Sequence, residues 1–403
     1  MTVNIGQTYY FKEVENNSLE ILFSPQRTGS YELVCCGMEQ MEALFEYGRN
    51  EEIYQSSYNN NKHMLFIAKT LLYQQVYCVC IHINGTQSRQ TILSLRIEPI
   101  LEPTNSLFKY QWGLLNKNNG YDINILPLWK YIRKSNVKIG IADTGINYNH
   151  CNLKGFIYSD LAYNFVKNIK DDTENIESEH GTHTAGIVAA QPDNNVGICG
   201  VTENPNVISL KIFGKSEKSY KVSDAFVMAV HYAIKHKIKI INCSFCGAVF
   251  SQKEKKIMEE AKNILFVVAA GNNSCNFEYE RMYPACYELE NSIVVAAVDR
   301  EGKIYTTSNY GKCVDVAAPG ENIVGLYGKD SFIKSNGTSA AAPFVTGVCS
   351  LLLETKQDLK PKDLKKIVTS SENVTLVKGL EKSTKSGGII NAYKAYRYLM
   401  MNF

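Results

Sequence analysis

Residues 137–145 read Val-Lys-Ile-Gly-Ile-Ala-Asp-Thr-Gly. The mostly apolar residues 137–142 are followed directly by the carboxylate of Asp143. A run of this length is typical of a buried strand, and Asp143 stands at its carboxyl end. Similar segments follow along the chain, with strands expected at 238–243 and 264–269 and helices at 225–234 and 254–263. Alternation of apolar strands with helices predicts an α/β fold, in which helices cover both faces of a parallel sheet. Active sites of such folds lie at the carboxyl ends of the strands, where we expect Asp143.

Two further segments place a reactive side chain where a loop meets a helix. His180 opens the segment His-Gly-Thr-His-Thr-Ala-Gly, and Ser339 lies within Asn-Gly-Thr-Ser-Ala-Ala-Ala-Pro at 336–343. A serine hydroxyl needs an adjacent base, histidine suits that task near neutral pH, and a buried carboxylate orients the imidazole. The chain order Asp, His, Ser is one of the known orders of such a triad. We therefore predict that Asp143, His180 and Ser339 are catalytic.

From about Ser106 to near the C-terminus, the sequence resembles the subtilisin-like serine proteases (the subtilase family), of the bacterial type with some kexin-like features. The resemblance rests on the three segments above and on others in the family's order, at 244–247, 269–272, 283–285 and 314–320. It implies a subtilisin-like catalytic domain that acts as a serine endopeptidase. Such an enzyme hydrolyses peptide bonds through an acyl-enzyme, and its partner is a peptide or protein substrate.

The resemblance also implies roles for residues around the triad. Asn272 matches the side-chain donor of the oxyanion hole, and Gly271 beside it belongs to the substrate-binding segment. Ser244, Phe245 and Cys246 match the strand that pairs with the substrate backbone. A glycine is typical at the last of these positions, so the cysteine predicts a narrower cleft.

Kexin-like features are present at residues 107–114 and 337–343, but Thr144 stands where kexin-like enzymes have an acidic residue. A general bacterial subtilase is therefore the better subgroup. Glu278 lies where kexin-like enzymes keep a pocket acid. Two interpretations of Glu278 stay open, namely a preference for arginine or lysine at the cleavage site and an ordinary solvated carboxylate.

The predicted reaction requires no cofactor, but the resemblance raises the question of calcium. Many subtilases bind this ion in the loop that corresponds to residues 192–198, where Asn194 and nearby carbonyls would be ligands. Calcium prefers hard oxygen ligands, including carboxylates. The paired carboxylate of the family is replaced here by Asn152, whose amide oxygen is a weaker ligand. Calcium at Asn194 is thus one alternative, and a metal-free loop is the other.

Residues 1–100 predict a β-rich, sandwich-like domain that precedes a catalytic domain at 101–403. The expected strands are 19–24, 31–35, 76–83 and 91–97, with Asn84-Gly85 as a hairpin turn signal between the last two. Residues 98–99 and 102–106 indicate a linker. The β-rich domain is either an inhibitory propeptide or a permanent accessory domain. We favour the accessory domain because the usual propeptide of this family is a small α/β unit.

Composition narrows the partners and the cellular setting. The chain has 403 residues, with 43 basic and 40 acidic side chains and a formal net charge of +3. This balance argues against a nucleic-acid or membrane-surface partner, and no apolar run approaches the roughly 18 residues of a membrane span. The twelve cysteines are scattered through apolar segments, which favours free thiols. Without a signal-like start, we expect a cytoplasmic protein, or a secreted one if a signal segment precedes Met1.

The sequence leaves two alternative functions open. One is a dedicated maturation protease that removes leader peptides from a peptide natural product, which the cysteines and the start of the chain support. The other is a catalytically silent pseudoprotease that only binds peptides. The intact triad and Asn272 argue against the pseudoprotease.

Overall fold

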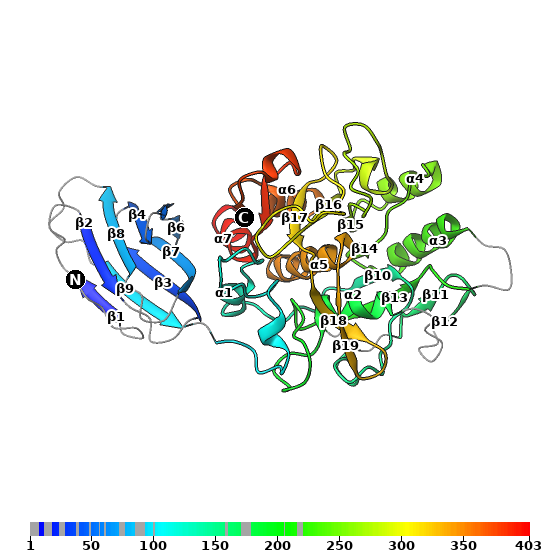
Figure 1. Cartoon of the computed structure of the whole chain (residues 1–403), viewed down its shortest axis with the longest axis horizontal. Coiled ribbons are helices and arrows are strands. Elements are labelled where there is room, and N and C mark those ends of the chain that lie inside the picture. The colour runs from blue at the N-terminus through cyan, green and yellow to red at the C-terminus, as the bar shows by residue number, and fades with distance from the viewer. Residues whose placement is uncertain are drawn as a thin grey trace. The chain divides into compact units, whose positions relative to one another are not determined.

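In the computed structural model, the chain forms two compact units (Figure 1). The first unit comprises residues 1–102, 117–120 and 399–403, and the second comprises 103–116 and 121–398. Across both units, the structure describes residues 8–11, 18–23, 29–37, 40–47, 50–55, 57–59, 62–71, 77–84, 93–99, 101–157, 160–170, 179–204, 206–215 and 221–403.

The first unit consists of antiparallel strands in the described part of residues 1–100, as the sequence predicts. One sheet has the strand order β1-β9-β3-β7-β6 and the other has the order β2-β8-β4-β5. The strands are β1 Thr8–Phe11, β2 Ser18–Phe23, β3 Gly29–Gly37, β4 Gln40–Tyr47, β5 Asn50–Gln55, β6 Ser57–Asn59, β7 Lys62–Leu71, β8 Tyr77–Asn84 and β9 Leu93–Pro99. Whether this unit is an accessory domain or a propeptide stays a prediction.

Each of these two sheets has a buried face. On β3, the alternate residues Tyr31, Leu33 and Cys35 are buried, as expected for side chains that share one face of a strand. In the other sheet, Ile21 of β2 is paired with Val79 of β8, and both are fully buried. Since β4 of one sheet contacts β7 of the other, the arrangement is that of a small sandwich.

Two local predictions in this region are wrong. Asn84-Gly85 does not connect a hairpin, because β8 pairs with β2 and β4 whereas β9 pairs with β1 and β3 in the other sheet. Residues 98–99 are not a linker, since Glu98 and Pro99 are paired with β3. The local turn and proline signals are overridden by pairing with strands distant in the sequence.

The second unit has a central sheet with the order β12-β11-β13-β10-β14-β15-β16-β17-β21-β20. Neighbouring strands are parallel from β11 to β21, and the edge strands β12 and β20 are antiparallel to their neighbours. The strands are β10 Ile139–Asp143, β11 Tyr163–Asn164, β12 Ile169–Lys170, β13 Val207–Lys211, β14 Ile240–Cys243, β15 Leu265–Ala269, β16 Ser292–Val298, β17 Val316–Pro319, β20 Val374–Leu376 and β21 Gly388–Ile390. A separate hairpin is formed by β18 Ile323–Tyr327 and β19 Ser331–Ser335.

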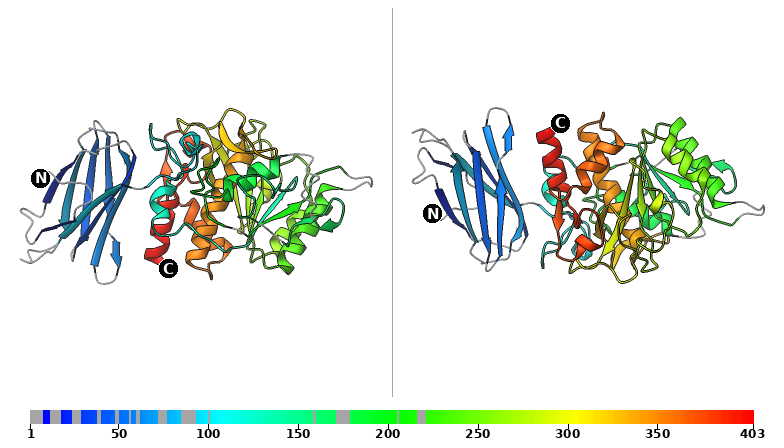
Figure 2. Two further views of the ribbon diagram at one scale, coloured as in Figure 1. Left: turned by 90° about the horizontal axis from the view of Figure 1, so that it is seen from below. Right: turned by 90° about the horizontal axis from the view of Figure 1, so that it is seen from above.

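Helices cover both faces of the central sheet, as Figure 2 shows. The helices in the described ranges are α1 Ile125–Trp129, α2 His180–Ala189, α3 Val222–Lys235, α4 Gln252–Glu260, α5 Thr338–Thr355, α6 Pro361–Thr369 and α7 Ala392–Asn402. One hydrophobic cluster joins α2 to the sheet, and another joins α3 and α4 to it. The predicted α/β fold is confirmed, and no helix in the described ranges is long and apolar enough to cross a bilayer.

Alternation along β10 decides where its last side chain lies. Ile139 and Ile141 belong to the cluster with α2, whereas Ala142 belongs to the cluster with α3 and α4. Because strand side chains alternate between the two faces, Asp143 lies on the same side as Ile139 and Ile141. The carboxylate is therefore placed on the side of the sheet where α2 begins.

The start of the second unit is fixed rather than linker-like. Asn105 is 4% exposed and is hydrogen-bonded to the loop that follows α2. Leu107 N–H donates to Gly197 O at 2.8 Å, and the side-chain amide of Gln111 makes two bonds of 2.8 Å with the backbone of Cys199. The prediction of a linker through residue 106 is therefore wrong for its last residues.

The cysteines of the described residues are free thiols wherever the structure gives their state. These include Cys275 and Cys286, which flank one loop. Most of the others are buried in the core, where cysteine behaves as a small apolar residue.

Candidate functional site

Asp143 and His180 form a direct pair at the junction of a strand and a helix. Asp143 ends β10 and His180 begins α2. His180 Nδ1 lies 2.8 Å from Asp143 Oδ1 and 2.9 Å from Oδ2. The Asp143 side chain is 2% exposed and that of His180 is 41% exposed. The negative carboxylate raises the pKa of His180, and this effect outweighs partial burial, which acts in the opposite direction.

Thr144 connects the end of β10 to the start of α2. Its backbone N–H donates to Asp143 Oδ1 at 2.7 Å, and its Oγ1 accepts the N–H of Gly181 at 3.0 Å. A side chain at Gly181 would not fit, because its Cβ would lie 2.3 Å from Gly145 O. In the sequence, Thr144 is notable only as a departure from the kexin-like pattern, so this positioning role is not predicted there.

The second histidine of the same segment has a different environment. His183 is 7% exposed, and burial lowers its pKa to about 4. Its ring packs against Gly325, where a Cβ would lie 2.3 Å from the imidazole. His183 is thus neutral at physiological pH and packs in the interior, whereas His180 faces a carboxylate.

The side-chain oxygen of Asn272 is fixed by hydrogen bonds. Its Oδ1 accepts the backbone N–H of Thr338 at 2.9 Å and the hydroxyl of the same residue at 3.1 Å. Thr338 Oγ1 in turn accepts the N–H of Gly271 at 3.0 Å. Because the oxygen faces Thr338, the NH₂ group of Asn272 points away from it and is oriented as a donor. Thr338 therefore positions Asn272, although the sequence suggests no role for it beyond its place beside Ser339.

Asn309 forms hydrogen bonds with the backbone on both sides of Asn272. It is fully buried, its Oδ1 accepts the N–H groups of Asn273 and Cys275 at 2.9 Å, and its Nδ2 donates to Ala270 O at 2.9 Å. A single buried asparagine has no recognisable sequence pattern, so sequence reasoning does not identify this residue.

Ser339 is the second residue of α5, the helix that packs against α2. The residue before the helix, Gly337, has φ of 120°, and a Cβ there would lie 2.8 Å from the Asn272 amide. Only glycine is suited to this position. Ser339 is half-buried at the N-terminus of an 18-residue helix, where the helix dipole favours negative charge.

A chain of buried hydrogen bonds links α5 to β14 at this point. Thr346 Oγ1 donates to Asn242 Oδ1, and Asn242 Nδ2 donates to Ser244 Oγ, both at 2.8 Å. Ser244 Oγ then donates to Ser339 O at 2.9 Å. The Ser244 side chain is therefore used to hold the backbone of Ser339.

The other residues predicted to bind substrate follow Ser244 at the end of β14. Phe245 packs edge-on against Phe213 and Phe226, with ring centroids 5.4 and 5.5 Å apart. Cys246 is half-buried, and a Cβ on Gly271 would lie 3.2 Å from its Cβ. Cys246 therefore lies beside the segment that carries Asn272.

Glu278 and Asn194 have partners of their own. Glu278 Oε2 lies 3.3 Å from Lys312 Nζ, with both side chains about half exposed. Asn194 belongs to the loop after α2, and its Oδ1 accepts a hydrogen bond from Asn105 Nδ2 at 3.0 Å. Among the predicted site residues, the structure thus brings Asp143 into contact with His180 and Asn272 into contact with the start of α5. Asn194 belongs to a different hydrogen-bond network, the one around Asn105.

The chain is similar to known proteins in sequence and in fold. A sequence model described as the subtilase family matches residues 134–390. Thermitase from Thermoactinomyces vulgaris is 33% identical over 276 residues, which are 67% of this chain and 92% of thermitase. The major intracellular serine protease of Bacillus subtilis (strain 168) is 32% identical over 246 residues, covering 57% of this chain and 76% of that protein. A solved protease structure from Pseudoalteromonas arctica PAMC 21717 has a TM-score of 0.63 at 25% identity, covering 74% of this chain and 99% of that chain.

Replacing Asp143 by asparagine is expected to lower the pKa of His180. In the wild type, the carboxylate stabilises the imidazolium, so the proton is retained to higher pH. The neutral amide of Asp143→Asn removes this attraction and leaves burial to favour the neutral ring. An NMR titration of the His180 ring protons measures the change.

The control for this titration is Glu278→Gln, which removes an exposed carboxylate that is paired with Lys312. It is expected to leave the His180 titration unchanged. Equal His180 pKa values in the wild type and Asp143→Asn would contradict the assigned cause.

Proposed function

Because the chain belongs to the subtilase family, it is a serine endopeptidase with peptide or protein substrates, and we propose that Asp143, His180 and Ser339 are its catalytic triad. The observation that supports this most directly is the pair of short contacts between His180 Nδ1 and the buried Asp143 carboxylate. A second is the half-buried position of Ser339 at the start of α5, the helix that packs against α2.

In the proposed reaction, Ser339 Oγ attacks the carbonyl carbon of the scissile peptide bond. Since Nδ1 of His180 faces Asp143, Nε2 takes the proton from Ser339. The Asp143 carboxylate stabilises the imidazolium that forms and fixes the orientation of the ring. His180 then returns the proton to the leaving amine, which produces an acyl-enzyme, and water releases the second product by the same steps.

The tetrahedral intermediate carries a negative oxygen that needs donors. We assign this task to the NH₂ group of Asn272 and the backbone N–H of Ser339. The support is that Thr338 holds Asn272 Oδ1 with two hydrogen bonds, which turns the NH₂ group away from Thr338. Such preorganised donors are effective because they need no reorientation as charge develops.

Substrate recognition is assigned to residues 244–247 and to Gly271. Cys246 adds a side chain beside Gly271, which supports the hypothesis of a narrowed cleft. The Glu278 carboxylate is partly compensated by Lys312, so it would attract a basic side chain less strongly than an unpaired carboxylate. A preference for arginine or lysine through Glu278 stays a prediction.

Replacing Ser339 by alanine is expected to abolish cleavage, with a loss of about a millionfold in turnover. The wild type and Ser339→Ala are incubated with a mixed peptide library, and the products are identified by mass spectrometry. The matched control is Ser331→Ala, which changes an exposed serine of β19. Equal cutting by Ser339→Ala and the wild type would contradict the assignment of the nucleophile, and no cutting by the wild type would favour the pseudoprotease.

Replacing Thr338 by valine tests how Asn272 is positioned. Valine keeps the shape of the side chain but removes the hydroxyl that contacts Asn272 and Gly271. We expect kcat to fall, by less than the roughly 100- to 1000-fold typical of losing the oxyanion donor itself, with KM little changed. Steady-state kinetics on one peptide substrate gives both constants.

Thr355→Val at the other end of α5 is the control for Thr338→Val, since its hydroxyl contacts only the helix backbone at Leu351 O among the described residues. Its kinetic constants should match those of the wild type. A wild-type kcat for Thr338→Val would contradict the positioning role of this hydroxyl.

Replacing Cys246 by glycine is expected to broaden the substrate range. If the side chain narrows the cleft, its removal should admit larger residues next to the scissile bond, seen as a several-fold rise in kcat/KM for those peptides. Library profiling before and after the change measures this, with Cys151→Ala as a control in a different part of the unit. Identical profiles for the wild type and Cys246→Gly would reject the hypothesis.

A further inference from the structure

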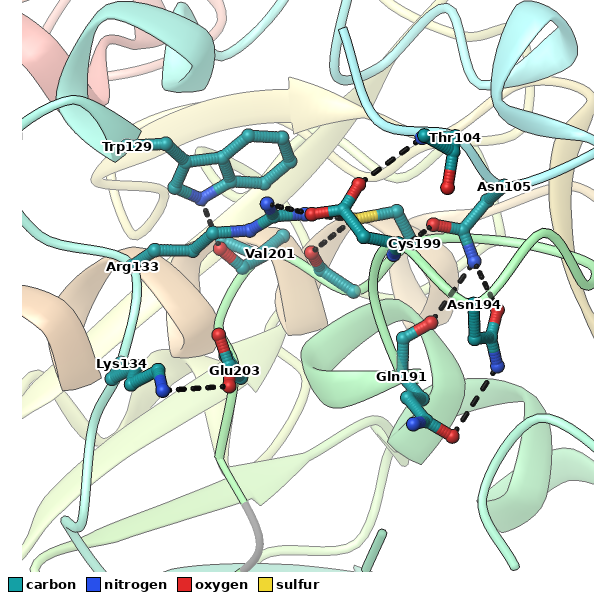
Figure 3. A network of polar contacts seen from close by, with 12 residues as sticks. Thr104, Asn105, Trp129, Arg133, Lys134, Gln191, Asn194, Cys199, Val201 and Glu203 are labelled. Carbon is teal, nitrogen blue, oxygen red and sulfur yellow. Dashed lines mark hydrogen bonds and ion pairs between the residues drawn. The ribbon is translucent and has the colours of Figure 1, made fainter. Parts of the chain in front are cut away.

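Four oxygens of the second unit converge on one side-chain nitrogen. Nδ2 of Asn105 lies 2.9 Å from Gln191 O, 3.0 Å from Asn194 Oδ1, 2.7 Å from Val196 O and 2.9 Å from Ile198 O. Figure 3 shows the amide of Asn105 directed at Asn194 and Gln191. We call these four acceptors the oxygen cage. Several oxygens directed at one point are typical of a cation site, yet an amide nitrogen lies at this point.

The orientation of this amide is fixed by a backbone donor. Asn105 Oδ1 accepts the N–H of Asp193 at 2.8 Å. If the amide were reversed, its NH₂ group would face that N–H, and its oxygen would face four other oxygens. The NH₂ group therefore faces the oxygen cage, where its two hydrogens are shared among four acceptors. At 4% exposure, Asn105 leaves little access for water to compete for these bonds.

The residues around the oxygen cage do not fit a calcium ion. Calcium sites rely on carboxylates to balance the charge of the ion, and all four cage oxygens are neutral carbonyl or amide oxygens. Asn152 stands where the family has a carboxylate, and its Oδ1 is already used to accept the N–H of Ile198 at 2.8 Å. Nowhere in the described ranges do three or more His, Cys, Asp or Glu side chains gather as a metal site.

The carboxylate within residues 191–198 is already paired with a cation. Asp193 forms an ion pair with Arg133 and accepts the N–H of Thr104 at 3.1 Å. The Arg133 guanidinium lies 4.6 Å from the ring centroid of Trp129, and its Nη2 is 3.4 Å from Cys199 Sγ. Figure 3 shows this guanidinium next to the Trp129 ring. A fixed positive charge beside the loop also disfavours a second cation nearby.

We propose that the Asn105 amide takes the place of a metal ion in this loop, so that residues 191–198 keep their conformation without calcium. The amide supplies donors to the oxygens that would otherwise face an ion, and Arg133 neutralises Asp193. The loop is thereby held by residues of the chain itself, whatever the concentration of calcium. This proposal does not depend on the catalytic roles assigned above.

Melting of the full-length chain in excess EDTA and in excess CaCl₂ tests the proposal. The wild type is expected to have the same Tm in both, and mass spectrometry of metals should find no bound calcium. Asn105→Asp removes the two donors and directs a carboxylate at the oxygen cage. Its Tm should fall by about 5 °C in EDTA and rise again in CaCl₂.

Asn263→Asp is the matched control, because it makes the same change of charge at an exposed asparagine between α4 and β15. Its Tm should respond to neither additive. If Asn105→Asp fails to fold, hydrogen exchange of residues 191–198 in the wild type still tests whether the loop needs calcium. Equal protection in EDTA and CaCl₂ supports the proposal. Loss of protection in EDTA, restored by CaCl₂, would overturn it, as would an Asn105→Asp variant as stable in EDTA as the wild type.

Discussion

A buried carboxylate that must be satisfied constrains the arrangement of the second unit. Asp143 is almost fully enclosed at the end of β10, and an isolated carboxylate in such a place would be strongly unfavourable. It is satisfied by Thr144 N–H and by His180 Nδ1, which requires α2 to begin at the end of this strand. The small residue Gly181 permits that close approach. The position of the strand, the start of the helix and the protonation of the histidine thus depend on one contact.

The start of α5 depends on a second set of buried polar contacts. On one side, Thr346, Asn242 and Ser244 pass hydrogen bonds to the backbone carbonyl of Ser339. On the other side, Thr338 links the same helical turn to Asn272. Because every member of such a network is satisfied, it rigidifies the site. The proposed nucleophile, Ser339 at the start of α5, and the proposed oxyanion donor, Asn272 after β15, are consequently held by one set of hydrogen bonds.

The sequence predicts the elements that depend on a local pattern. The strands at 240–243 and 265–269 and the helix at 222–235 fall within a few residues of their expected places, since apolar periodicity is itself local. The reactive residues of the motifs also lie at the ends of the expected elements. Thr144 and Thr338 could be suspected only as neighbours of predicted catalytic residues, because their roles depend on which backbone group they meet in the folded chain.

The features that the sequence does not predict depend on contacts between distant parts of the chain. The Asn84-Gly85 signal favours a hairpin, but β8 and β9 lie in different sheets and each pairs with strands elsewhere in the chain. Asn309 is one polar residue whose side-chain hydrogen bonds all reach residues distant in the sequence. Asn105 stands in a segment with linker composition, and nothing local indicates that it meets four acceptors some ninety residues away.

Residues 104–111 are bonded to the loop after α2, which limits where a shorter fragment of this protein can begin. The backbone of Thr104 and Leu107 and the side chains of Asn105 and Gln111 all bond to residues 191–199. A fragment that begins after Thr104 would lose the first of these bonds, and one that begins after Gln111 would lose them all. The N-terminal boundary of a fragment that keeps all of these bonds therefore lies ahead of Thr104, well before β10.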